Sequence, residues 1–440
     1  MNKKLHFLWL VLLLLGSTVC VNAQESACKA GEPEPEMTIT YDKMIGGRVQ
    51  LNIVADGAFS IEGIQEIAES GNNFYTLTSP TITIFGKIKE LTAIYSSILT
   101  IDVTKMPSLQ LLDIFGNQIE NIDLTNNVNL KQLLLGGSSV KELNLSTCPK
   151  LEFLNINNSS IEKLDLSNSG ALHTLLARGS KVKNWDLTGA NRLEVLDCSF
   201  VELESINLEK APALNQLACV GNNLTSLDLS KSPNLVVLNC NANQLTSLDL
   251  TQLPLLEELG CSKNQITELD CSKCPKIFGM IINSNQIGHK KMSQLIEGMP
   301  TVEAQPGYVV VIDQKDTNEK NVCTESNVAK ANDKNWDVLD YDGGSNFDGP
   351  GIPYTGSPDD EVSIDAFEQH EWVAYPTVAE DLVYVDRVAE GTPVRIIDLQ
   401  GRVVLQETAR NNQAVLNVAA LDRGVVILSV GDEYTRVVLK

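Results

Sequence analysis

The chain has 440 residues, more than one hydrophobic core usually serves, so two or more structural units are expected. Its 34 basic and 56 acidic residues give a formal charge of −22, and loss of Lys3 and Lys4 with an N-terminal signal takes it to −24. Such a surface repels phosphate backbones and anionic lipid heads, which argues against nucleic acid and direct membrane binding. We interpret the acidity as favouring solubility, with attraction to a basic partner as the alternative.

Residues 1–23 have the organisation of a secretory signal peptide. A basic start at Lys3 and Lys4 precedes an apolar stretch from Leu5 to Leu15, and Val21-Asn22-Ala23 supplies a cleavage site. The apolar run is too short for a transmembrane span, and no second apolar segment of membrane length follows. We expect export, cleavage after Ala23 and no transmembrane segment in the mature chain.

Residues 24–87 predict an N-terminal cap for the repeats that follow. Segments Met37–Tyr41, Val49–Val54 and Thr81–Phe85 alternate like strands, and a helical piece is expected near Ile64–Glu69. A repeat array needs its open ends covered, which is the role we assign to this region.

A period of 21 residues defines ten units, from Ile88 to Ile287, without an insertion or deletion. Apolar residues recur at positions 1, 4 and 6 of each unit, and again at positions 11, 14 and 16. The first column reads Ile88, Leu109, Leu130, Leu151, Leu172, Leu193, Leu214, Leu235, Leu256 and Ile277. We place the repeat region at residues 88–291.

The first half of each unit predicts a short strand, because Leu-x-Leu or Leu-x-Cys alternates with period two. Fixed returns stack these strands in register as a parallel sheet along one wall. An asparagine column at position 9 is expected to bond to backbone groups left open by the turn. Its members are Asn117, Asn222, Asn243, Asn264 and Asn285. Each unit buries its apolar side chains only against a neighbour, so the stack is stable collectively.

This pattern resembles the leucine-rich-repeat superfamily, and specifically the bacterial internalin J-like 21-residue class with a cysteine ladder. The resemblance covers nearly half of the chain. It implies a mostly β fold, a solenoid with a parallel β-sheet and capping regions, while function within the superfamily stays broad.

Cysteines recur in the inward column of four consecutive units, at Cys198, Cys219, Cys240 and Cys261. We interpret them as a structural ladder of small buried hydrophobic residues. Disulfides between adjacent rungs are the alternative, although in-register side chains point side by side. The internalin J-like resemblance also implies free thiols.

Cys271 and Cys274 form a lone CxxC pair, with no second pair at zinc-ligand spacing. Cys271 occupies an apolar column, so we interpret it as core filler rather than a metal ligand. We expect no metal site and no cofactor. Asp340, Asp342, Asn346 and Asp348 could offer oxygen ligands to calcium, but they lack the spacing of an EF-hand, and we interpret them as part of a solvated linker.

The repeat pattern breaks at Lys290, which replaces an apolar residue at position 14. Residues 292–340 predict a C-terminal cap with helices near Met292–Glu297 and Asn327–Ala331, a strand at Tyr308–Ile312, and a strand that opens at Trp336. Residues 341–368 are rich in Gly, Pro, Ser and Asp and predict a linker.

Residues 369–440 predict a small antiparallel β-sandwich, because six short strands are separated by turn residues. Tyr375-Pro376, the segment Asp398–Val403, Leu421–Gly424 and the final Lys440 resemble the type IX secretion C-terminal sorting domain of Bacteroidetes. Thr377-Val378 and Val426 depart from the usual motif. The resemblance assigns the sorting signal to five residues: Asp398, Gly401, Arg402, Gly424 and Lys440. It implies recognition by the type IX secretion machinery and an outer-membrane cell-surface or extracellular location, with attachment through lipopolysaccharide.

Side chains at positions 3, 5 and 7 of each unit should face outward on the concave side of the sheet. Early units place apolar residues there and later units place polar ones, which predicts an apolar anchor beside a polar rim. The predicted partner-binding residues are Ile94, Tyr95, Leu111, Phe115, Leu134, Phe153, Asn155, Asn157, Leu176, Asp197, Asn239 and Asn241. Strand propensity alone is the competing explanation for the apolar ones.

The sequence offers no converging catalytic groups. Its mature histidines, His173, His289 and His370, are scattered, and an aspartate column recurs because each turn needs it. We therefore expect a binding or adhesion module rather than an enzyme, with a protein or surface glycan on a host or bacterial surface as partner. A self-associating surface or biofilm-matrix component is the alternative.

Overall fold

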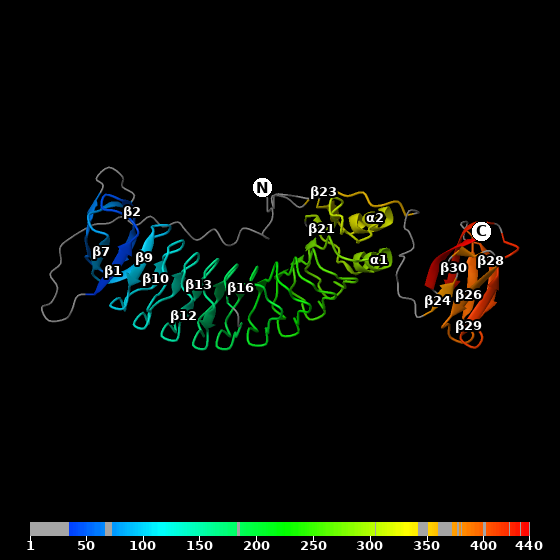
Figure 1. Cartoon of the computed structure of the whole chain (residues 1–440), viewed down its shortest axis with the longest axis horizontal. Helices are drawn as coiled ribbons and strands as arrows, with labels where there is room; N and C mark the ends of the chain where they lie inside the picture. Colours follow the sequence, from blue (N-terminus) through cyan, green and yellow to red (C-terminus); the bar gives the residue numbers. More distant parts are fainter. Residues whose placement is uncertain are drawn as a thin grey trace. The chain divides into compact units, whose positions relative to one another are not determined.

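The computed structural model describes residues 35–66, 73–182, 185–303, 305–341, 351–359, 372–375, 378–379, 381–398, 402–421, 423–431 and 433–439. The chain divides into two compact units, residues 1–356 and 357–440. The first unit holds the repeats with a cap at each end, and Figure 1 shows the repeats side by side in one curved row. The second unit is a small sandwich of strands.

The N-terminal cap consists of short antiparallel strands that pack on the first repeats. Two small sheets have the orders β4-β7-β1-β9 and β2-β6-β5, and β3 pairs antiparallel with β8. The strands of the cap are β1 (Glu36–Tyr41), β2 (Arg48–Gln50), β3 (Asn52–Ala55), β4 (Ser60–Glu62), β5 (Ile64–Glu66), β6 (Phe74–Leu77) and β7 (Thr81–Phe85), and the first repeat contributes β8 (Ile88–Thr92) and β9 (Ile98–Asp102).

The helix expected near Ile64–Glu69 is wrong over residues 64–66, which form β5. This segment pairs with β6, Ile64 opposite Leu77 and Glu66 opposite Tyr75. A neighbouring strand satisfies the backbone at once, whereas a one-turn helix must pay for nucleation with few hydrogen bonds. The remaining residues of that prediction lie outside the described residues.

The parallel sheet of the repeats is confirmed. Among the described residues it belongs to a 14-stranded sheet in which each repeat strand pairs with the next. Partners are 21 residues apart, as in Leu112 with Leu133 and Leu154 with Leu175. The strands are β10 (Leu111–Asp113), β11 (Gln132–Leu134), β13 (Phe153–Asn155), β15 (Thr174–Leu176), β16 (Val195–Asp197), β17 (Gln216–Ala218), β18 (Val237–Asn239), β19 (Glu258–Gly260) and β20 (Gly279–Ile281).

The apolar columns fill the interior of the solenoid. Leu112, Leu133 and Leu154 are fully buried, and so are their equivalents in later units. On the opposite wall, β12 (Glu142–Asn144) pairs with β14 (Lys163–Asp165). Aspartates of that wall accept the backbone N–H two residues ahead, as Asp249 does from Thr251 at 2.9 Å. The predicted structural role of the aspartate column is therefore confirmed.

The asparagine column bonds to the turn backbone as expected. Asn243 donates through Nδ2 to the carbonyl oxygens of Cys219 and Cys240, at 2.9 and 3.1 Å, and its Oδ1 accepts the N–H of Leu224. Asn321 extends the column into the C-terminal cap, donating to the carbonyl oxygens of Ile282 and Val311. The bonds of Asn243 tie its own turn to the turn of the preceding unit.

The cysteine ladder is also confirmed. Cys198, Cys219, Cys240 and Cys261 are fully buried and free. Burial raises the pKa of the Cys240 thiol to about 12. These side chains therefore act as core residues, and Cys271 and Cys274 are likewise buried and free.

The C-terminal cap follows the predicted order. It contains α1 (His289–Gly298), β21 (Gly307–Ile312), α2 (Glu325–Asp333), β22 (Trp336–Asp340) and β23 (Ile352–Pro353). Strands β21 and β22 extend the parallel sheet beyond β20, and β23 pairs antiparallel with β22.

Part of the predicted linker belongs to this cap. Tyr354 is buried, and its hydroxyl donates to the carbonyl oxygen of Cys323 at 3.2 Å. An aromatic ring with a hydrogen-bonded hydroxyl anchors an otherwise Gly- and Pro-rich segment, which composition alone does not reveal. Of the oxygen ligands considered for calcium, Asp340 is buried and accepts the N–H of Gln314 at 3.1 Å, and Asp342, Asn346 and Asp348 lie outside the described residues.

The C-terminal unit has the two-sheet arrangement that the sequence predicts. One sheet has the order β24-β26-β29 and the other β25-β31-β30-β27-β28. Val383, Ile396, Leu416 and Leu428 are fully buried in its core. The strands are β24 (Val373–Tyr375), β25 (Val378–Ala379), β26 (Leu382–Asp386), β27 (Pro393–Ile397), β28 (Val403–Thr408), β29 (Gln413–Asn417), β30 (Gly424–Val430) and β31 (Glu433–Leu439).

Candidate functional site

The outward face of the repeat sheet brings the predicted binding residues together. Because side chains alternate along each strand, the residues beside each buried leucine project outward. Register places Leu111, Gln132 and Phe153 in one row and Leu134, Asn155 and Leu176 in the next. Residues 21 apart in sequence thus become neighbours about 4.8 Å apart.

Exposure differs among these residues. Tyr95 is 70% exposed. Leu176 and Asn155 are buried, so the expectation that they face solvent is wrong. The Oδ1 of Asn155 accepts the N–H of Asn157 at 3.0 Å, which holds this side chain against the backbone. The half-buried predicted residues are Ile94, Leu111, Phe115, Leu134, Phe153, Asn157, Asp197, Asn239 and Asn241.

The turn that follows each strand contains a left-handed residue at position 8 of every unit. Glycine occupies four of these positions, at Gly116, Gly137, Gly179 and Gly221, where positive φ costs little. In the other units a residue with a β-carbon adopts the same positive φ, which raises the conformational energy of the backbone. Those residues are Tyr95, Asn158, Phe200, Ala242, Lys263 and Ser284, with φ from 49° to 57°.

Tyr95 and Phe200 are the bulky members of this column and both are exposed. Each ring lies over the glycine at the same position of the next unit. A β-carbon on Gly116 would stand 2.2 Å from the Tyr95 ring, and one on Gly221 would stand 2.4 Å from the Phe200 ring. The Tyr95 ring also packs edge-on against Phe115, with centroids 5.6 Å apart.

Arg178 extends this aromatic edge onto the concave face. Its guanidinium carbon lies 4.4 Å from the centroid of the Phe200 ring, a cation–π contact. A recess of about 710 Å³ opens beside Phe200, between the turns at residues 179–182 and 200–205. The hydroxyl of Ser180, which lines it, is buried and has no hydrogen-bond partner among the described residues.

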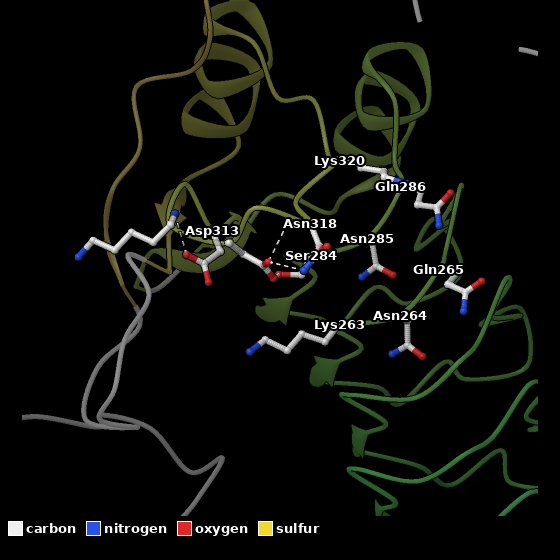
Figure 2. A pocket seen from close by; sticks show the side chains of 11 residues that line it. Lys263, Asn264, Gln265, Ser284, Asn285, Gln286, Asp313, Asn318 and Lys320 are labelled. Atoms are coloured by element: carbon white, nitrogen blue, oxygen red, sulfur yellow. Dashed lines mark hydrogen bonds between the residues drawn. The ribbon is translucent and has the colours of Figure 1, made fainter. Parts of the chain in front are cut away.

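Figure 2 shows a second recess, of about 630 Å³, where the last two repeats meet the C-terminal cap. Its polar groups are engaged within the chain. Ser284 donates its hydroxyl to Asp316 at 2.9 Å, and Asn285 donates to the carbonyl oxygens of Cys261 and Ile282. We interpret this recess as a structural junction.

Glu258 is the unusual carboxylate of the concave face. It is 4% exposed, and its Oε2 has no hydrogen-bond partner among the described residues. Burial raises its pKa to about 7, and the charge of Glu257 adds to the rise. Beside it, the Tyr308 ring fills the space that a side chain on Gly279 would need. The carboxyl of Glu258 therefore titrates near neutral pH.

The residues expected to carry the sorting signal lie in the second unit. Asp398 accepts the backbone N–H of Arg402 at 2.8 Å and its guanidinium Nε–H at 2.7 Å, which closes the turn between β27 and β28. Gly424 begins β30 with a φ of +139°. Gly401 and Lys440 lie outside the described residues.

Residues 373–440 match the family model described as "Secretion system C-terminal sorting domain". This tail directs the chain out of the cell. The match indicates export by type IX secretion to the cell surface or the extracellular space. In the part of the chain that the structure describes, no helix has the length and apolar character needed to cross a membrane.

Solved structures with a similar fold include bacterial leucine-rich-repeat proteins. An internalin (InlF) of Listeria monocytogenes shares 18% identity over 55% of this chain and 71% of its own, with a TM-score of 0.47. The functional domain of InlJ from the same species, which includes a cysteine ladder, shares 19% over 81% and 93%, with a TM-score of 0.39. A protein of Leptospira interrogans shares 19% over 48% and 58%, with a TM-score of 0.42. A search of the curated proteins finds no match.

Sequence reasoning missed Arg178 and Phe200. Phe200 stands in a column where four other units have glycine, and that substitution is visible in the sequence. Arg178 stands in an outward column that otherwise holds apolar, small or amide side chains. The contact between them depends on the turn conformation, which the repeat pattern does not specify.

Proposed function

We propose that this chain is an exported adhesion module that binds a partner on a host or bacterial surface through the concave face of its solenoid. One observation carries the proposal: half-buried apolar side chains from three consecutive strands share the outward face of the sheet, where they alternate in register with polar ones. Leu111, Phe115, Leu134 and Phe153 are each half-buried there. A solvent-facing cluster of this kind is unusual unless another molecule covers it.

The neighbouring residues support the same proposal. Polar side chains such as Asn157, Asn239 and Asn241 continue the face toward the later repeats. An apolar centre with a polar margin is the usual anatomy of a protein interface. The sorting tail adds a location in which an external partner is accessible. Binding rather than catalysis is therefore the role that we assign.

The test compares variants L134S and F153S with the wild-type mature chain. Binding of labelled protein to cells that carry the partner should fall about tenfold or more for either variant, because each removes buried apolar contact area. V128S is the matched control, since Val128 is 45% exposed but lies outside the face. Equal binding by all four proteins contradicts the proposal. If light scattering shows that the wild-type chain self-associates and that L134S does not, the result would favour the alternative, a self-associating surface or biofilm-matrix component.

A further inference from the structure

Arg178 is the one basic residue at positions 3, 5 and 7 across the ten described repeat strands and their immediate continuations. Those positions otherwise carry apolar, small, amide, hydroxyl or acidic side chains. In a chain with a net charge of −22, a solitary cation in the middle of the candidate binding face is a distinctive feature.

The guanidinium of Arg178 is held in place without a counter-ion. It lies 4.4 Å from the centroid of the Phe200 ring, and no hydrogen bond or ion pair of this group is formed with the described residues. The nearest acid in the next strand, Asp197, uses its Oδ1 to accept the N–H of Ser199 at 3.0 Å. The donors of the planar guanidinium therefore remain available for a ligand.

Phe200 itself is fixed by its backbone and by its neighbour. It has a φ of 57°, a conformation that costs energy for a bulky residue, and its ring lies against the backbone of Gly221. The ring thus provides a rigid support that limits the conformational freedom of Arg178, so less entropy is lost when Arg178 binds.

The apolar group in contact with Arg178 is the exposed Phe200 ring, whereas the residues beside Arg178 on the two adjacent strands, Asn157 and Ser199, are polar. Leu176 lies two residues earlier on the same face, and Asn155 separates it from Leu134 in the register of the sheet. Phe153 lies on the adjacent strand. A ligand that reaches Arg178 across this face therefore covers hydrocarbon as well as charge.

We propose that Arg178, supported by Phe200, is the anchor for a carboxylate of the partner, an aspartate or glutamate side chain next to an apolar residue in a protein segment. A planar guanidinium matches a carboxylate with two parallel hydrogen bonds. The exposed Phe200 ring and the half-buried Leu134 and Phe153 farther along the face favour a protein over an acidic glycan, since a peptide supplies an apolar residue as well. This inference rests on the proposed function, because it names the partner chemistry of the same face.

The recess beside Phe200 provides room for the rest of that segment. Ser180 lines it, but its hydroxyl is enclosed, as are those of Ser138 and Ser159 at the same position of earlier units, so this group belongs to the interior of the repeats. Lys181 of one turn and Glu202 and Glu204 of the next line the recess. One lysine against two glutamates leaves these three residues with a net formal charge of −1, so the recess does not attract an acid and Arg178 is the group that selects it.

The experiment selects random displayed peptides against the intact mature chain and four variants, R178Q, R178K, F153S and R192Q. Arg192 is an exposed arginine away from the face, so R192Q is the matched control. Peptides selected on the wild type should contain Asp or Glu beside Leu or Phe. A synthetic peptide of that sequence should bind about tenfold more weakly to R178Q, with R178K intermediate and R192Q unchanged. Its Asp→Asn version should bind equally weakly to the wild type, with no further loss on R178Q.

Three outcomes overturn the inference. Peptides that bind F153S weakly but bind R178Q as tightly as the wild type would agree with the proposed function and would show that Arg178 does not contribute to it. An absence of any peptide sensitive to F153S or R178Q would count against both. Polygalacturonate that competes for Arg178, where acidic peptides do not, would assign the anchor to an acidic glycan.

Discussion

The Phe200 ring lies over Gly221 so closely that a β-carbon at residue 221 would stand 2.4 Å from Cε1. Gly221 also has a φ of +66°. Two constraints therefore coincide at one residue, left-handed backbone and the aromatic ring of the preceding repeat.

The variant G221A should lower the urea midpoint of unfolding more than G137A. Both positions are left-handed, at φ +66° and +71°, so each substitution carries a backbone cost of about 1 kcal/mol. A β-carbon on Gly137 would meet only the backbone of Gly116, at 3.3 Å. Adding F200A to G221A should recover the difference. An equal decrease of the urea midpoint in G221A and G137A would contradict this, because it would show that the Phe200 ring moves aside without cost.

Asn243 should be among the most costly polar residues to remove. Its side chain makes four hydrogen bonds, within its own turn and to the preceding one, and N243A leaves buried backbone groups of both turns without these partners. We expect a loss of roughly 2–4 kcal/mol, measured by urea denaturation. N234A is the control, because exposed Asn234 donates only to the carbonyl oxygen of Pro212. A similar small loss in both variants would contradict the structural role of the column.

Glu258 should make stability depend on pH near neutrality. Burial raises its pKa from 4.5 to about 7, so the folded chain retains a proton that the unfolded chain releases between these values. The contribution of the protonated Glu258 side chain to the free energy of unfolding is fully present below pH 4.5 and is lost as the pH rises through 7. E258Q should remove this dependence and raise stability at pH 8 by on the order of 2 kcal/mol. The measurement is the difference in denaturation midpoint between wild type and E258Q from pH 5 to 8. A difference that stays constant with pH would contradict this.

The ladder cysteines should be unreactive in the folded chain. Burial raises the pKa of the Cys240 thiol to about 12, and Cys198, Cys219 and Cys261 are equally buried. Thiolate is the reactive form, so a thiol reagent at pH 8 should modify these residues only after denaturation. A C28S background removes the one mature cysteine outside the described residues. Thermal stability that falls on reduction would instead indicate disulfides.

The repeat sheet could be predicted because the 21-residue period of the apolar residues follows directly from how the repeats pack on one another. Each leucine column is buried against the next repeat, so the 21-residue spacing specifies both the strand and its partner, as Leu112 and Leu133 show. The free cysteines followed from the same logic, since they stand in an inward column. The asparagine and aspartate columns were predictable as turn residues.

The predictions that failed depended on contacts that no period encodes. Ile64 enters a strand because β6 lies beside it, and Tyr354 is buried because Cys323 accepts its hydroxyl. Leu176 is buried although it stands at an outward position of its strand, and the alternation of side chains alone does not reveal this. Arg178 and Phe200 meet only because the turn at residue 200 is left-handed.

Photo-crosslinking tests the central claim, that the concave face binds the partner, most directly. A benzophenone amino acid at Gln132 would stand on that face, between Leu111 and Phe153 in the sheet. The same amino acid at Lys141 lies in the same repeat but beyond the turn, near the opposite wall. With partner-bearing cells, we predict a covalent adduct from position 132 and none from position 141. Adducts from position 141 alone, or from both positions equally, would contradict the claim.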